Sequence, residues 1–167
     1  QQWTFGAATM KRVVESETPM LSPFEIFPDC TQQHLDSNRA WLAPRFHDPA
    51  SNLLVISIQS FLIRQNGLTI LVDSCSGNDK ENRTRPQFKR AHWPWLDTLR
   101  GAGVKPEDVD IVLCTHLHVD HVGWNTRLDN GRWVPTFPKA RYLIGRREFD
   151  YWKADGPKVL ERAGDYI

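Results

Sequence analysis

The sequence predicts an α/β fold. Apolar, β-branched segments alternate along the chain with a segment of helical spacing, and this order is typical of the class. A loop rich in histidine follows directly after one apolar segment, where open α/β sheets place their ligands. The 167 residues are enough for one domain with a hydrophobic core.

Residues 1–52 show little regular pattern. Five prolines interrupt them, and their apolar side chains follow no sustained period. We expect one or two strands here, followed by an excursion that is either an N-terminal arm packed on the body or a segment that covers a substrate pocket. The predicted domain organisation therefore separates 1–52 from 53–167.

Two strands joined by a tight turn come next, at Leu53–Arg64 and Leu68–Val72. Asn66 and Gly67 between them tolerate positive φ, as a two-residue hairpin turn requires. The second strand is almost wholly apolar, which predicts burial on both faces of a sheet. It ends at Asp73, where a polar loop begins.

A helix is predicted from Trp95 to Ala102, because its apolar residues recur at helical spacing and glycines follow them. The remaining elements are expected in this order: a turn at 106–108, a second buried strand at 110–114, a hairpin-like turn at 130–131, a short strand at 141–144 and a helix starting at 146.

Charge and composition exclude several kinds of partner. With 21 basic and 20 acidic side chains, the chain gives no electrostatic reason to expect nucleic acid or an anionic membrane as its partner. No apolar run approaches the ~18 residues of a membrane span. Three widely spaced cysteines form neither a disulfide framework nor a metal knuckle. We expect a cytoplasmic protein with a small-molecule substrate, and a removed export signal stays open because the sequence does not begin with Met.

The loop after the second buried strand carries three of the six histidines in the spacing His-x-His-x-Asp-His. In an extended loop, residues two apart point to the same side, so His116, His118 and Asp120 are expected to converge. His121 is expected to point away from them, toward a second centre. Imidazole and carboxylate ligands suit zinc, and also iron or manganese.

The segment Thr-His-Leu-His-Val-Asp-His-Val-Gly at 115–123 resembles the signature of the metallo-β-lactamase superfamily of metal-dependent hydrolases. Residues 71–78 resemble its strand-Asp-loop element, and 99–110 resemble the helix and turn that precede the metal loop. Residues 124–126, 133–138 and 140–142 resemble the branch containing acyl-homoserine lactonases and methyl-parathion-hydrolase-like enzymes. The resemblance covers about residues 50–152.

This resemblance implies an αββα sandwich holding two divalent metal ions, zinc first, with manganese or iron as alternatives. His116 and His118 would bind the first ion, and Asp120 and His121 the second. Asp120 would also act in catalysis by orienting a metal-bridging hydroxide. Asp73 matches a position that supports the site from behind, although it could instead cap a turn. Trp124 could form a pocket wall or a packing contact.

One departure from the family pattern concerns the ligands. The family completes its site downstream with a His, a bridging Asp and a further His, whereas this sequence contains no histidine after His121. The resemblance therefore implies that the chain supplies the N-terminal half of the sandwich. We expect its partner to be the absent C-terminal half or, in a homo-oligomer, a second copy of the chain.

Three functions are consistent with these observations. The first is hydrolysis of a lactone, ester or phosphotriester-like substrate by a dinuclear metal site. The second is iron-dependent oxidative chemistry on the same fold, which Asp120 and His121 disfavour because they keep a second metal position available. The third is an inactive fragment with a structural or partner-packing role, unstable or oligomeric on its own. A nuclease is disfavoured by the neutral charge.

Overall fold

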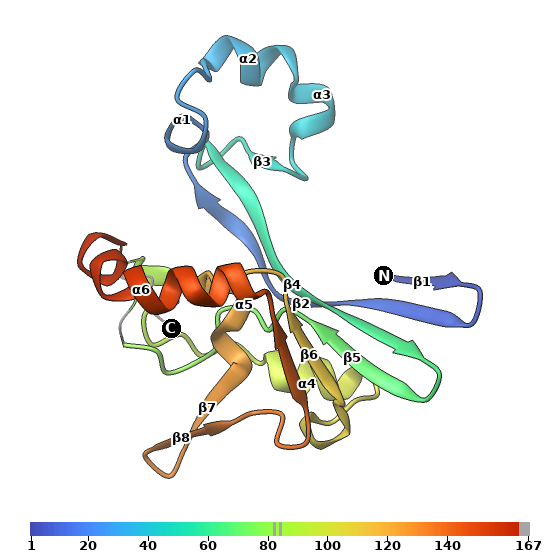
Figure 1. The fold of residues 1–167 in the computed structure, drawn as a ribbon. Coiled ribbons are helices and arrows are strands. Elements are labelled where there is room, and N and C mark those ends of the chain that lie inside the picture. The colour runs from blue at the N-terminus through green and yellow to red at the C-terminus, as the bar shows by residue number, and fades with distance from the viewer. Residues whose placement is uncertain (82, 84, 164–167) are drawn as a thin grey trace. The chain divides into compact units, whose positions relative to one another are not determined.

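A computed structural model describes residues 1–81, 83 and 85–163 of the chain (Figure 1). The chain forms two compact units. The larger unit comprises Gln1–Glu15 and Ile58–Ile167, and the smaller comprises Ser16–Ser57. Because the first fifteen residues group with the larger unit, the N-terminal segment contributes directly to the body that carries the histidine loop.

One mixed sheet organises the described part of the chain. Its strands follow the order β1-β2-β4-β5-β6-β9, and β3 pairs with β4. β5 pairs antiparallel with β4 and parallel with β6, which pairs parallel with β9. The bounds are β1 Gln2–Phe5, β2 Ala8–Leu21, β3 His47–Asp48, β4 Leu53–Gln65, β5 Leu68–Val72, β6 Ile111–Cys114 and β9 Arg141–Ile144.

Two tight turns confirm the sequence prediction. Asn66 and Gly67 connect β4 to β5 with φ values of 51° and 76°. Asn130 and Gly131 connect β7 (Thr126–Asp129) to β8 (Arg132–Pro135) with φ values of 49° and 77°. Positive φ at both central residues is the conformation that two-residue hairpins need, and Asn-Gly adopts it at low cost.

The helices of the larger unit also lie where the sequence predicts them. α4 spans Trp95–Gly101, and α6 spans Arg146–Ala163. The histidine loop contains one helical turn, α5 (Val119–Val122), that the sequence analysis does not anticipate. Three short 3₁₀ turns complete the unit: η1 Pro86–Phe88, η2 Pro106–Asp108 and η3 Gly123–Asn125.

The prediction that β5 is buried on both faces is wrong, because Leu68 is 43% exposed and only Leu71 of this strand is fully buried. Leu71 and Val112, which face each other in register, are fully buried. Leu113, one residue further along β6, is 37% exposed, because successive strand residues point to opposite faces. The buried face lies over a core that includes Trp95 and Leu99 of α4.

The smaller unit contains three short helices, α1 (Pro23–Ile26), α2 (Gln32–Ser37) and α3 (Arg39–Leu42). Ser22 and Thr31 cap the first two of them with side-chain hydrogen bonds, as N-cap residues do. The sequence predicts one or two strands before this excursion, and β1 and β2 are those strands. Whether the excursion covers a pocket stays a prediction. No helix in the described ranges is long and apolar enough to cross a membrane.

The loop after β5 is joined to the histidine loop by backbone contacts. Ser74 N donates to the His121 carbonyl at 2.7 Å, Gly123 N to the Cys75 carbonyl at 2.7 Å and Trp124 N to the Ser74 carbonyl at 2.8 Å. A Cβ atom at Gly123 would lie 1.9 Å from the carbonyl carbon and oxygen of Ser76. Only glycine therefore allows the two loops to approach this closely.

We predict that Gly123→Ala lowers the free energy of unfolding by about 2 kcal/mol or more, because the added methyl overlaps backbone that cannot move aside. Gly101→Ala is the matched control. No atom lies within 4 Å of a Cβ at that position, and alanine is the better helix former, so we expect no loss of stability. Urea unfolding followed by circular dichroism measures both, and equal stability of the two variants would contradict the prediction.

Candidate metal centre

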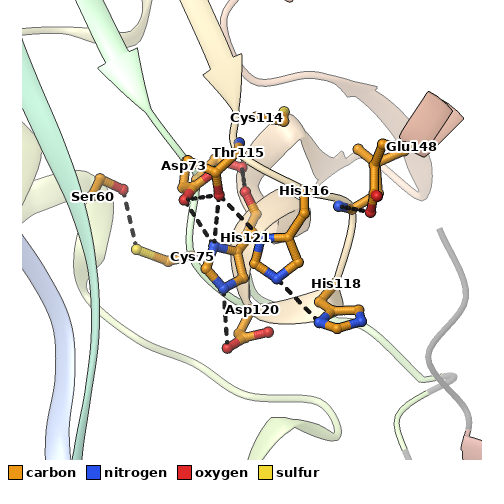
Figure 2. Close-up of polar contacts among 12 residues, drawn as sticks. Ser60, Asp73, Cys75, Cys114, Thr115, His116, His118, Asp120, His121 and Glu148 are labelled. Atoms are coloured by element: carbon orange, nitrogen blue, oxygen red, sulfur yellow. Dashed lines mark hydrogen bonds and ion pairs between the residues drawn. The ribbon is translucent and has the colours of Figure 1, made fainter. Parts of the chain in front are cut away.

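The candidate site lies at the carboxyl ends of two neighbouring parallel strands. Asp73 follows β5 directly, and Thr115 begins the loop that follows β6. Because these strands pair in parallel, both loops leave the sheet at the same edge. Figure 2 shows that the side chains of Asp73, Thr115 and the histidine loop gather there.

The first two histidines of the loop form a close pair. His116 Nε2 lies 3.1 Å from His118 Nδ1, and the two rings meet nearly at right angles, at 78°. This convergence agrees with the sequence analysis. The pair presents two ring nitrogens to one point at the edge of the site.

Asp120 and His121 form a second pair, which corrects the predicted directions. Asp120 Oδ2 lies 3.5 Å from His121 Nε2, so Asp120 converges with His121 rather than with the first pair. The His121 ring does not point away, because its centroid lies 3.9 Å from that of His116. The reason is α5, since a helical turn at 119–122 replaces the alternation of an extended loop. The two pairs are therefore adjacent.

Asp73 contacts His121 of the second pair directly and is linked to His116 of the first pair through Thr115. Its buried carboxylate accepts hydrogen bonds from Thr115 N at 2.8 Å, Thr115 Oγ1 at 2.7 Å and His121 Nδ1 at 2.8 Å. Burial alone raises the pKa of Asp73, but the hydrogen bonds from His121 and Thr115 outweigh it and hold the pKa below its ordinary value. Burial lowers the pKa of His121, but the hydrogen bond to Asp73 and the negative charges of Asp120 and Asp73 together outweigh it and raise this pKa.

These contacts select the ring nitrogens that carry protons. His121 donates from Nδ1 to the carboxylate, which leaves the Nε2 lone pair facing Asp120. Thr115 uses its one hydroxyl hydrogen toward Asp73, so its oxygen accepts from Nδ1 of His116 at 3.1 Å. That leaves the Nε2 lone pair of His116 facing His118. One carboxylate thereby orients a ring in each pair.

The distance between the two donor atoms of each pair fits two ligands of one metal ion. Two nitrogens, or one nitrogen and one carboxylate oxygen, bound to a tetrahedral zinc ion at about 2.0–2.2 Å lie roughly 3.4 Å apart. The observed separations of 3.1 Å and 3.5 Å lie on either side of that value. Within the described residues, no three His, Cys, Asp or Glu side chains surround one point as a complete metal site would. Each pair therefore offers two donors, fewer than a complete metal site has.

Glu15 is a buried carboxylate that the sequence analysis misses. It accepts hydrogen bonds from Ser76 N at 3.0 Å, Gly77 N at 3.1 Å and Trp124 Nε1 at 2.7 Å. Burial raises its pKa, because no cation among these contacts offsets the desolvation of the charge. A possible sequence signal is its position two residues after Val13, on the inward side of β2. Glu15 holds the two loops together.

Trp124 is a packing residue, which decides an alternative that the sequence leaves open. Its side chain is 4% exposed and stacks on Trp95 with ring centroids 5.6 Å apart. The indole N–H satisfies Glu15 at the same time. A large buried aromatic with a bonded N–H anchors the end of the histidine loop to the core.

Residues 54–165 match the Metallo-beta-lactamase superfamily, and the match covers more than half of the chain. The chain belongs to this superfamily. The resemblance that the sequence analysis bases on the His-x-His-x-Asp-His loop is therefore confirmed, and so is the α/β fold class.

Curated relatives in this superfamily include lactonases. The chain is 31% identical over an alignment of 118 residues to the N-acyl homoserine lactonase AttM of Rhizobium radiobacter, and the match covers 60% of this chain and 41% of the relative. It is 26% identical over an alignment of 126 residues to the N-acyl homoserine lactonase AiiB of Agrobacterium fabrum, and this match covers 68% of this chain and 41% of that protein. The chain thus spans less than half of the length of these relatives.

Solved structures confirm the fold. The hydrolase AbOPH of the beta lactamase superfamily matches with a TM-score of 0.70 and 24% identity, over 96% of this chain and 52% of that one. AidC, a dizinc quorum-quenching lactonase, matches with a TM-score of 0.70 and 19% identity, over 98% of this chain and 54% of that one. The chain corresponds to about half of each of these structures.

The Asp73–His121 contact makes the stability of the metal-free protein depend on pH. Asp73 contributes stability that is complete above its ordinary pKa, about pH 4, and is lost as the pH falls through its lowered pKa in the folded protein. His121 contributes stability that is complete below its ordinary pKa, about pH 6.5, and is lost as the pH rises through its raised pKa in the folded protein. Asp73→Asn should therefore cost most between these values, about 2 kcal/mol. Urea unfolding of the chelator-treated protein from pH 3 to 9 measures this, and a cost that does not vary with pH would contradict it.

Proposed function

We propose that this chain contributes the first ligands of a dinuclear metal centre in a hydrolase that cleaves a lactone, with esters and phosphotriesters as related substrates. The observation that carries the proposal is the pairing of four donors at one sheet edge, His116 with His118 and Asp120 with His121. Two of the relatives described above are N-acyl homoserine lactonases, which favours a lactone as the substrate.

In this proposal each side chain has a defined task. His116 and His118 hold one divalent ion, and Asp120 and His121 hold the other, with zinc as the metal that suits these donors best. Bound ions of this kind lower the pKa of water and polarise the carbonyl or phosphoryl oxygen under attack. Asp73 keeps the His121 Nε2 lone pair free by accepting a hydrogen bond from the protonated Nδ1. Asp120 also orients the attacking water through its carboxylate.

Further ligands are required, because two donors per ion are too few for tight binding. We propose that a later His, Asp and His supply them, from a continuation of the chain or from a partner. The proposal that a second part supplies these ligands is supported by the length that the chain matches, which is 41% of the lactonase AttM of Rhizobium radiobacter. The site is then completed only when that second part packs beside the carboxyl ends of β5 and β6.

His118→Ala tests the proposal in the whole protein. Removing one nitrogen from the first pair should lower zinc content and reduce the hydrolysis of an N-acyl homoserine lactone by at least about a hundredfold. His92→Ala is the matched control. His92 is exposed and lies 3.6 Å from Asp79, outside the site, so activity should not change.

Metal analysis of the purified protein together with this assay gives the outcomes that would reject the proposal. Wild-type protein without divalent metal, or unchanged lactone hydrolysis in His118→Ala, would each contradict it. A single iron per chain would instead support iron-dependent oxidative chemistry.

A further inference from the structure

We propose that Glu148 of α6 is a positioning residue for the first metal pair, acting with Trp152 on the loop between His116 and His118. The inference rests on the proposed function, since it concerns how that pair is held. Figure 2 shows Glu148 beside this loop, on the side away from Asp73. α6 follows β9, the strand that pairs with β6, so the helix begins at the same edge of the sheet.

One carboxylate oxygen forms the contact with the loop. Glu148 Oε1 accepts a hydrogen bond from the backbone N–H of Leu117 at 2.8 Å. The same oxygen accepts from Trp152 Nε1 at 2.8 Å, one helical turn further along α6. Hydrogen bonds to a carboxylate are stronger than those between neutral groups. The bond from Trp152 also fixes the carboxylate itself, so that it presents a defined acceptor to Leu117.

Trp152 adds a direct contact with the pair. Its ring lies edge-to-face against His118, with ring centroids 5.7 Å apart and planes at 89°. Trp152 is buried, whereas His118 is exposed, so the fixed indole packs against one side of a ring that is otherwise open to solvent and contacts His116. The indole therefore restrains the imidazole and orients Glu148 at once.

The geometry distinguishes this contact from the support that Asp73 provides. Asp73 orients His121 directly and His116 through Thr115, and none of its contacts named above reaches His118. Leu117 is the residue between the two histidines, and its side chain is buried. Holding its N–H fixes the backbone from which both rings project. We therefore infer that loss of Glu148 weakens the first metal position and leaves the second, at Asp120 and His121, unchanged.

The test uses Glu148→Ala and Glu148→Gln in the whole protein, with Asp150→Ala as a control. Asp150 carries the same charge on an exposed position of the same helix. Glutamine retains an oxygen that can accept both hydrogen bonds, so it should rescue the function that alanine loses. Trp152→Phe removes one donor and keeps an aromatic ring beside His118, so its effect should be smaller than that of Glu148→Ala.

Two measurements are made on each variant. Amide hydrogen exchange of the chelator-treated protein should show Leu117 exchanging about tenfold faster in Glu148→Ala and as in wild type in Asp150→Ala. Zinc titration against a competing chelator should show the affinity of one of two ions weakened by about tenfold to a hundredfold in Glu148→Ala. Glu148→Gln should stay close to wild type in both.

The outcomes separate this inference from the proposed function. Wild-type protein that binds no zinc would overturn both. Two ions bound by wild type, with both affinities unchanged in Glu148→Ala, would overturn the inference alone. Equal weakening of both ions, or a glutamine variant as weak as the alanine variant, would also overturn it, because general destabilisation or charge would then explain the loss.

Discussion

The hydrogen bonds to the Asp73 carboxylate are the interaction on which the candidate site depends. A carboxylate buried at a strand end needs donors to offset its desolvation, and Thr115 and His121 supply them. Both donors belong to the loop after the neighbouring strand. The need to satisfy one buried charge therefore brings that loop to Asp73, and with it the four donors proposed to bind metal.

The surrounding structure keeps these loops in place from several sides. Backbone hydrogen bonds join residues 74–75 to 121–124, and the absence of a side chain at Gly123 allows this approach. Glu15 ties the same two loops to β2, which explains why an N-terminal strand belongs to the unit that carries the site. The contacts that hold the fold together therefore also fix the directions of the proposed metal ligands.

Local features of the fold could be predicted from the sequence, and long-range ones could not. Asn66-Gly67 and Asn130-Gly131 adopt the expected turns because the conformational preference resides in those residues. The four proposed donors could be identified because they lie within six residues, and the family resemblance implies the same two pairs. The directions expected from an extended loop were wrong, since residues 119–122 form the helical turn α5. Glu15 and Glu148 left no comparable signal, because their partners at Ser76 and Leu117 lie 61 and 31 residues away.

Asp73 sets the tautomers of two histidines, His121 directly and His116 through Thr115. Nitrogen-15 NMR of the chelator-treated protein, at a pH where both rings are neutral, measures this most directly because it distinguishes protonated from unprotonated ring nitrogens. We predict a proton on Nδ1 and a free lone pair on Nε2 in both rings, and loss of this preference in Asp73→Asn. A protonated Nε2 in either ring of the wild-type protein would contradict this role of Asp73.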